Sequence, residues 1–178
     1  MRADARRNYA ALVDAARAAL TEHGAAVSLE EVAARAGVGI GTLYRHFPRR
    51  LDLLEAVYRD DVEMLAHSAE TLSDSCPEWE ALEQWLFVFI GYASTKRVLF
   101  HELVDAIGKD SELLTHSRQV IDASVTRVLV RAQQAGVARA DVQPSDLLRL
   151  VGGCTMMPNL EPDQQERMLR IVLDGLRS

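Results

Sequence analysis

Cysteine and long apolar runs are scarce in this chain of 178 residues, and each scarcity excludes a class of protein. The two cysteines, Cys76 and Cys154, are too few for a disulfide framework or a four-cysteine zinc site. The longest apolar stretch, residues 85–93, is much shorter than the roughly 18 residues that a membrane span needs. The first residues also lack the apolar centre of a signal peptide. We therefore expect a cytoplasmic protein with reduced cysteines and no membrane association.

Segments in which apolar and polar residues alternate, as they do in strands, are also nearly absent. Apolar residues instead recur every three to four positions, which is typical of amphipathic helices. We predict an all-α fold of about nine helices, at 4–23, 29–36, 40–47, 50–72, 78–93, 97–107, 111–135, 144–156 and 162–176. Residues 1–48 would form an N-terminal head and residues 49–178 a helical body, with the fourth helix linking the two.

An excess of positive charge occurs only in the first part of the chain, although the whole chain has a net charge of −6. Residues 1–50 hold eight Arg and five acidic residues, a net charge of +3, whereas the remainder has −9. The acidic total excludes a protein that coats nucleic acid uniformly, but the basic head is suited to meet a polyanion.

Two short helices joined by a glycine-containing turn are predicted between residues 28 and 48. Ser28 and Glu31 have the spacing of a capping box that begins the first of them. Residues 37–39 connect it to the second helix, and Pro48 ends the second helix. In a helix-turn-helix, the first helix braces against the DNA backbone and the second enters the major groove. The spacing therefore predicts a DNA-binding head.

The residues of this segment resemble the DNA-binding head of the TetR family of bacterial regulators. The run ARAGVGIGTLYRHFPRRLDLL at residues 34–54 is similar to the family's pattern A-G-V-S-x-G-T-L-Y-x-H-F-x-x-K-x-x-L-L. The resemblance covers about residues 5–60, and the segments 141–150 and 171–177 look like one branch of the same family. It implies an N-terminal helix-turn-helix, a helical ligand-binding body and a homodimer.

The resemblance and the chemistry of the side chains together assign DNA contacts. Thr42, Tyr44 and His46 are hydrogen-bonding groups suited to phosphate oxygens. Arg50 stands where the family has Lys and would supply a phosphate cation at a helix N-terminus. Ile40 could touch a thymine methyl group. The predicted DNA-contacting residues are Ser28, Gly39, Ile40, Gly41, Thr42, Tyr44, Arg45, His46, Arg49 and Arg50.

Several residues near this segment admit more than one interpretation. Arg45 could contact a guanine or a phosphate, and Glu30 could accept from a cytosine amino group or point away from DNA. Gly39 stands where the family usually has Ser; it still caps a helix but supplies no hydroxyl. The basic residues at the N-terminus could follow the backbone, enter a minor groove or remain disordered; they are Arg2, Arg6 and Arg7.

In the body, Trp85, Phe89 and Tyr92 form an aromatic stripe at positions i, i+4 and i+7 of one predicted helix. The stripe is interpreted either as core packing or as the lining of a ligand pocket. The predicted pocket residues are Trp85, Phe89, Tyr92, Phe100, His101, Asp105 and Met156. His101 and Asp105 with His116 could hold a metal, but polar i, i+4 pairs are usually solvated, so we predict no metal and no cofactor. Dimer contacts are predicted along the last two helices, at Leu147, Leu148, Val151, Met168, Leu169, Val172 and Leu176.

These observations predict a sequence-specific DNA-binding transcriptional regulator. We expect a repressor that binds a palindromic operator in double-stranded DNA as a homodimer and is released by a small ligand. A ligand-independent or activating regulator is the alternative. An enzyme is not expected, because the sequence has no nucleophile elbow, phosphate loop or HExxH pair. A helical module that binds an acidic protein is the remaining hypothesis, and only DNA binding would combine a sequence preference with a log-linear salt dependence.

Overall fold

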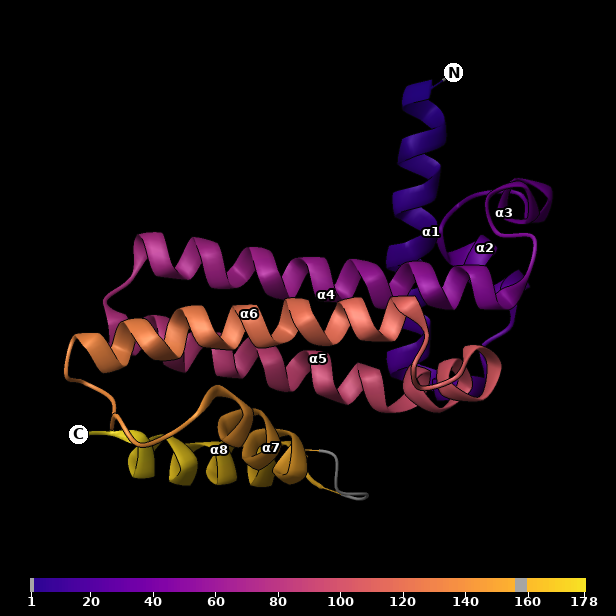
Figure 1. Cartoon of the computed structure of the whole chain (residues 1–178). Coiled ribbons are helices and arrows are strands. Elements are labelled where there is room, and N and C mark those ends of the chain that lie inside the picture. The colour runs from indigo at the N-terminus through magenta and orange to yellow at the C-terminus, as the bar shows by residue number, and fades with distance from the viewer. Residues whose placement is uncertain (1, 156–159) are drawn as a thin grey trace. The chain divides into compact units, whose positions relative to one another are not determined.

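The computed structural model describes residues 2–155 and 160–178, and these residues form an all-α fold (Figure 1). Eight α-helices and one short 3-10 helix lie within the described ranges. They are α1 (Arg2–His23), η1 (Gly24–Ala26), α2 (Leu29–Arg35), α3 (Ile40–His46), α4 (Arg50–Ser75), α5 (Glu78–Ile107), α6 (Glu112–Gln134), α7 (Pro144–Thr155) and α8 (Pro162–Leu176). The closest approach to a strand in these ranges is an isolated bridge between Ala138 and Arg177. The predicted fold class is confirmed.

Two predicted boundaries in the middle of the chain are wrong. The helices expected at 78–93 and 97–107 are one continuous helix, α5, because no glycine or proline occurs between residues 92 and 107 to end it. The loop expected at 73–77 is also shorter, since α4 continues to Ser75 and only Cys76 and Pro77 precede α5. Serine and aspartate favour turns only weakly, so the helix continues until the proline.

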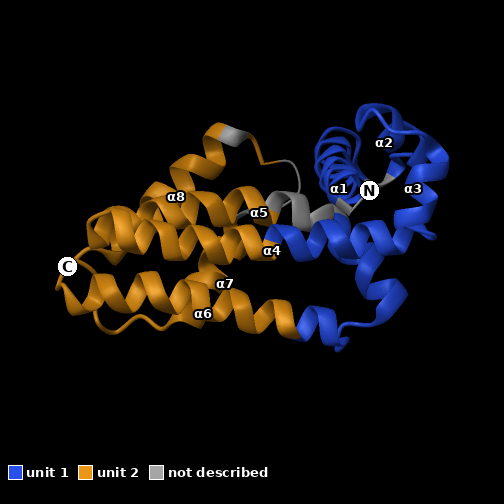
Figure 2. Cartoon of the chain, turned by 90° about the horizontal axis from the view of Figure 1, so that it is seen from above, with its two compact units in different colours: residues 1–61, 95–115 blue, residues 62–94, 116–178 orange. Residues whose placement is uncertain are grey.

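The described residues divide into two compact units, shown in different colours in Figure 2. Unit 1 comprises residues 1–61 and 95–115, and unit 2 comprises residues 62–94 and 116–178. In unit 1 the apolar sides of α1, α2, α3 and the start of α4 supply a core of fully buried side chains. The largest of these include Leu12, Leu20, Leu43, Phe47, Val57 and Tyr58.

Unit 2 is built around the first part of α5. Trp85 on α5 is completely buried, and its indole N–H donates to the Leu65 carbonyl of α4 over 3.1 Å. Val125 and Leu129 of α6 are also fully buried. Helices α7 and α8 pack against each other and bury an apolar side chain at nearly every turn, at Leu147, Val151, Leu169, Leu173 and Leu176. Over the described residues, no helix is both long and apolar enough to cross a membrane.

Candidate nucleic-acid interface

The segment from α2 to α3 has the local geometry of a helix-turn-helix. The Ser28 hydroxyl accepts from the Glu31 N–H over 3.1 Å and begins α2, as predicted. After α2, Gly37 adopts φ +67°, a left-handed conformation that favours glycine and turns the chain toward α3. Gly39 then begins α3, and its carbonyl accepts from the Thr42 N–H over 2.8 Å. The serine cap therefore begins α2, and the left-handed Gly37 makes the turn that leads to α3.

Helix α3 has a buried side and an exposed side. Leu43 and Phe47 are buried in unit 1, in agreement with the core role predicted for them. Tyr44 and Ile40 are exposed, with 45% and 39% of their surface accessible. A Cβ atom added at Gly39 or Gly41 would meet nothing within 4 Å, so packing within the chain does not require glycine at either position. Because the two glycines have no side chains, another molecule can come close to the backbone on the exposed side of α3.

The remaining predicted contacts on α3 flank this exposed side. Arg45 is exposed and lies back along the helix, where it donates to the Thr42 hydroxyl over 3.0 Å and to the Gly41 carbonyl over 3.3 Å. Thr42 and His46 are half-buried. The exposed side of α3 thus presents hydroxyl, imidazole and guanidinium groups together with one apolar side chain, Ile40.

The two arginines at the start of α4 differ in their partners. Arg49 is exposed and pairs with Asp52, the Nη2–Oδ1 distance being 2.5 Å. Its backbone N–H also donates to Asp52 over 2.9 Å, and these two bonds lower the pKa of the Asp52 carboxyl. Arg50 is half-buried: it donates to the Val27 carbonyl, and its Nε lies 3.4 Å from Glu102 Oε2 on α5. Of the two, Arg49 is the more accessible cation.

Tyr9 lies beside this surface, although the helical periodicity places it on the apolar side of α1. Its ring is 44% exposed and packs 6.1 Å from the His46 ring and 5.1 Å from the Phe47 ring, measured between centroids. The sequence offered no signal for this, because Tyr9 and His46 are 37 positions apart and meet only in the folded unit. Tyr9 therefore joins exposed Tyr44 and half-buried His46 as an accessible hydrogen-bonding group of unit 1.

The basic N-terminal residues belong to helix α1 in the structure. Arg6 and Arg7 are exposed, and Arg7 pairs with Asp4 in the first turns of the helix. Glu30 is exposed at the start of α2. These positions leave the interpretations of the arm and of Glu30 open.

An arginine-centred cluster joins α1 to α4 within unit 1. Arg17 pairs with Asp60 and, over 2.6 Å, with the buried Asp61. Burial raises the pKa of Asp61, and the bond from Arg17 acts in the opposite direction. The cluster fixes the position of α1, against which α2 packs.

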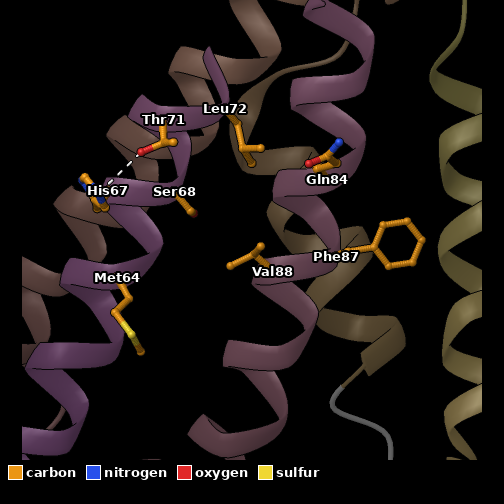
Figure 3. A pocket seen from close by; sticks show the side chains of 8 residues that line it. All are labelled: Met64, His67, Ser68, Thr71, Leu72, Gln84, Phe87 and Val88. Atoms are coloured by element: carbon orange, nitrogen blue, oxygen red, sulfur yellow. Dashed lines mark hydrogen bonds between the residues drawn. The ribbon is translucent and has the colours of Figure 1, made fainter. Parts of the chain in front are cut away.

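A groove runs between α4 and α5 in unit 2 (Figure 3). Its volume is about 640 Å³, within the range of small-molecule sites. The lining has no Asp, Glu, Lys or Arg and combines four apolar with four polar side chains: Met64, His67, Ser68, Thr71, Leu72, Gln84, Phe87 and Val88. Val88 points toward α4, whereas Phe87 points away from it.

The residues predicted to line a ligand pocket are placed elsewhere. Trp85, Phe89 and Tyr92 are buried, and the first two rings stack with centroids 5.5 Å apart. Phe100 is half-buried, while His101 and Asp105 are exposed on the part of α5 that belongs to unit 1. Met156 lies outside the described residues. No group of three potential metal ligands occurs within the described part of the chain.

The predicted dimer residues divide into two sets. Leu147, Val151, Leu169 and Leu176 are buried within the chain itself and hold α7 and α8 in place. Leu148, Met168 and Val172 are half-buried and so remain accessible in part. Sequence analysis missed the two most exposed apolar side chains of these helices, Leu150 and Ile171, with 53% and 70% of their surface accessible. Whether this face forms a dimer stays a prediction at this point.

Comparison with known proteins places both parts of the chain in one family. Residues 12–57 match the family model described as bacterial regulatory proteins of the tetR family. Residues 77–178 match the model of the C-terminal domain of SbtR-like transcriptional regulators. The curated Transposon Tn10 TetC protein of Escherichia coli is 30% identical over 145 residues, which cover 79% of this chain and 72% of that protein.

Solved structures agree with this assignment. A TetR transcriptional regulator from Streptomyces coelicolor is 37% identical, with a TM-score of 0.84 over 95% of this chain and 98% of that one. A TetR regulatory protein from Mycobacterium vanbaalenii is 34% identical, with a TM-score of 0.72 over 99% of both chains. The TetR-like regulator LfrR from Mycobacterium smegmatis, solved in complex with proflavine, shares the fold at 24% identity and a TM-score of 0.71 over 97% of this chain and 98% of that one.

Proposed function

We propose that this chain, which belongs to the TetR family of bacterial transcriptional regulators, is a repressor that a small ligand releases from a palindromic operator. The observation that carries the proposal is the exposed side of α3. Helix α3 is the second helix of a well-formed helix-turn-helix, and its exposed side presents Tyr44, Ile40 and two glycines. A helix of this kind enters the major groove, where the small residues permit close approach to base edges.

Two classes of DNA contact are proposed for this surface. Thr42, Tyr44, His46 and Arg49 would bind phosphate oxygens and set the position of the head without reading sequence. Gly39, Ile40, Gly41 and Arg45 would lie against the base edges, with Ile40 on a thymine methyl group. Ser28 already caps α2 through its hydroxyl oxygen, and its hydroxyl hydrogen would be its contribution to a phosphate.

The homodimer would form through the exposed apolar face of α7 and α8. Ile171 and Leu150 are large aliphatic side chains exposed on adjacent helices, and Leu148, Met168 and Val172 are half-exposed. Apolar surface that solvent reaches in a single chain commonly marks a site of association. A second copy presents the same face, so the contact would be self-complementary. Two copies of α3 about 34–36 Å apart would then read the halves of a palindrome.

A small ligand would act by binding two states of the dimer with different affinities. Two places in unit 2 are candidate sites: the buried aromatic stripe of Trp85, Phe89 and Tyr92, and the groove between α4 and α5. The groove favours a largely apolar molecule with a few hydrogen-bonding groups and no strong charge, because no Asp, Glu, Lys or Arg lines it. Val88→Trp would fill the groove, whereas Phe89→Ala would remove one ring of the stripe and leave a cavity there. The variant that changes the release of DNA by the ligand would show which of the two sites binds it.

The proposal is tested by selecting DNA from a random pool with the purified protein. Recovery of a palindrome, bound more weakly as salt rises, would support the operator and the dimer together. Arg45→Ala should change the recovered sequence, whereas Tyr44→Phe should weaken every sequence alike. Failure to enrich any sequence, in a protein that mass spectrometry shows to hold no copurified ligand, would refute the proposal.

A further inference from the structure

We propose that Glu102 of α5 controls the DNA affinity of the protein by holding Arg50, the cation at the start of α4. This inference rests on the proposed DNA-binding function and concerns how that function is regulated. Glu102 lies 52 positions from Arg50 in the chain, but both residues belong to unit 1. In this role Glu102 is a positioning residue, because it acts on DNA only through Arg50.

The contacts of Arg50 are the first part of the argument. One Nη1 hydrogen bond goes to the carbonyl of Val27, the buried residue that precedes the serine cap of α2. Nε lies 3.4 Å from Glu102 Oε2. The guanidinium therefore joins the backbone just ahead of the helix-turn-helix to a carboxylate on α5. Two of the directions in which Arg50 could donate to a phosphate are already taken by the protein.

The electrostatics of the pair are the second part. About a third of each side chain is accessible, 32% for Arg50 and 31% for Glu102, so solvent screens the pair only in part. A carboxylate this close offsets the positive charge that a phosphate would otherwise meet at the first turn of α4. By contrast, Arg49 is 70% accessible and pairs with Asp52 in the first turn of α4, three positions along the chain, so this pair does not join α4 to a distant helix.

Competition for one cation has a thermodynamic consequence. A DNA phosphate and Glu102 compete for Arg50, so a change that strengthens the Arg50–Glu102 pair weakens DNA binding. The coupling is reciprocal, so bound DNA also weakens the pair. Glu102 lies on the same continuous helix, α5, as the aromatic stripe and as three of the groove residues, Gln84, Phe87 and Val88. A ligand that favours the paired state would lower DNA affinity, which is the direction that a released repressor requires.

The test is a measurement of DNA affinity by fluorescence anisotropy at several salt concentrations, with the selected operator as probe. Glu102→Gln keeps the size and hydrogen-bonding capacity of the side chain but removes its charge. We expect it to bind DNA about two- to fivefold more tightly for each head of the dimer, the range of a partly exposed ion pair. The slope of log K against log salt should steepen by about 0.9 for each head, because each released Arg50 neutralises one more phosphate.

Two comparison variants separate this mechanism from a general charge effect. Glu112→Gln removes the same charge from an exposed site in the same unit and should leave both affinity and slope unchanged. In an Arg50→Ala background, Glu102→Gln should have no effect. Thermal unfolding of each variant confirms that it is folded.

Each other outcome overturns the proposal. Equal affinity of Glu102→Gln and the wild type would show that Glu102 does not restrain Arg50. A gain shared with Glu112→Gln, or one that persists without Arg50, would show direct repulsion of DNA by the acidic surface. In those cases the wild type still binds its operator and the proposed function stands; if neither protein bound DNA, the proposed function would fail and this inference with it.

Discussion

Helices α3 and α8 each leave one side exposed within a single chain, but the two sides have opposite chemistry. On α3 the exposed residues are Tyr44, Arg45, glycine and one isoleucine. On α8 the most exposed side chain is Ile171, with half-buried Met168 and Val172 beside it. Hydrogen-bonding groups suit a polyanion, whereas exposed isoleucine is stabilised only when another apolar surface covers it. The two exposed sides therefore support two separate proposed contacts, one with DNA through α3 and one with a second copy through α7 and α8, and each can be tested without the other.

The largest expected difference between the two contacts is in their dependence on salt concentration. With on the order of 6–10 phosphate contacts per dimer, raising salt from about 50 to 200 mM should lower DNA affinity by roughly 10³–10⁵-fold. The apolar contact of α7 and α8 depends little on salt at these concentrations, so the dimer dissociation constant should stay nearly constant. Anisotropy measures the first and analytical ultracentrifugation the second. If dimer affinity fell with rising salt as steeply as DNA affinity, the dimer contact would also be electrostatic.

Ile171→Asp should break the protein-binding face and leave the structure of the chain intact. Each dimer covers two copies of Ile171, and burial of one such side chain contributes about 1.5–3 kcal/mol. The dimer should therefore weaken by at least about 100-fold, with an unchanged circular dichroism spectrum. Gln164→Asp places the same charge on an exposed position of the same helix and is the matched control. A dimer that survives Ile171→Asp would locate the contact elsewhere.

Arg17→Met tests how firmly the DNA-binding unit is held together. The change leaves Asp61 buried without its cation and should lower the free energy of unfolding by about 3 kcal/mol at pH 7, the low end for a broken buried pair because Arg17 is partly accessible. Burial already raises the pKa of Asp61 in the folded protein, and loss of Arg17 raises it further. A raised carboxyl pKa means that stability falls as pH rises through it, so the deficit should shrink as the pH is lowered toward 4.

Chemical denaturation at both pH values measures this effect. Adding Asp61→Asn to Arg17→Met removes the unpaired charge and should recover part of the loss at pH 7. If Arg17→Met lowered the free energy of unfolding by the same amount at both pH values, the loss would come from the missing packing of the arginine stem and not from the unpaired Asp61.

Tyr44→Phe should have the smallest effect of the set. It removes one hydroxyl from the exposed side of α3, and a hydrogen bond to a charged phosphate contributes about 1.5 kcal/mol. DNA affinity should fall about tenfold for each head of the dimer, on every sequence alike, while dimerisation and thermal stability remain unchanged. A change in the selected operator sequence would show instead that Tyr44 contacts a base.

Several parts of this protein were determined by the sequence alone, because their signals are local. The caps, turn glycines and periodicity placed α1 to α4 closely, and the short-range pattern around Gly37 identified the helix-turn-helix. The same local reasoning failed where a signal was weak: it divided α5 at 93–97, although no residue there ends a helix.

Only the tertiary structure decided which side chains face each other or the solvent. Arg50 was predicted as a phosphate cation, but its pairing with Glu102 depends on where α5 passes in unit 1. Leu169 and Ile171 are chemically alike and two positions apart, yet the first is buried and the second is 70% accessible. Periodicity gives the phase of a helix only to within a neighbouring residue, whereas the packing of α7 on α8 fixes which stripe is covered and which is left for a partner.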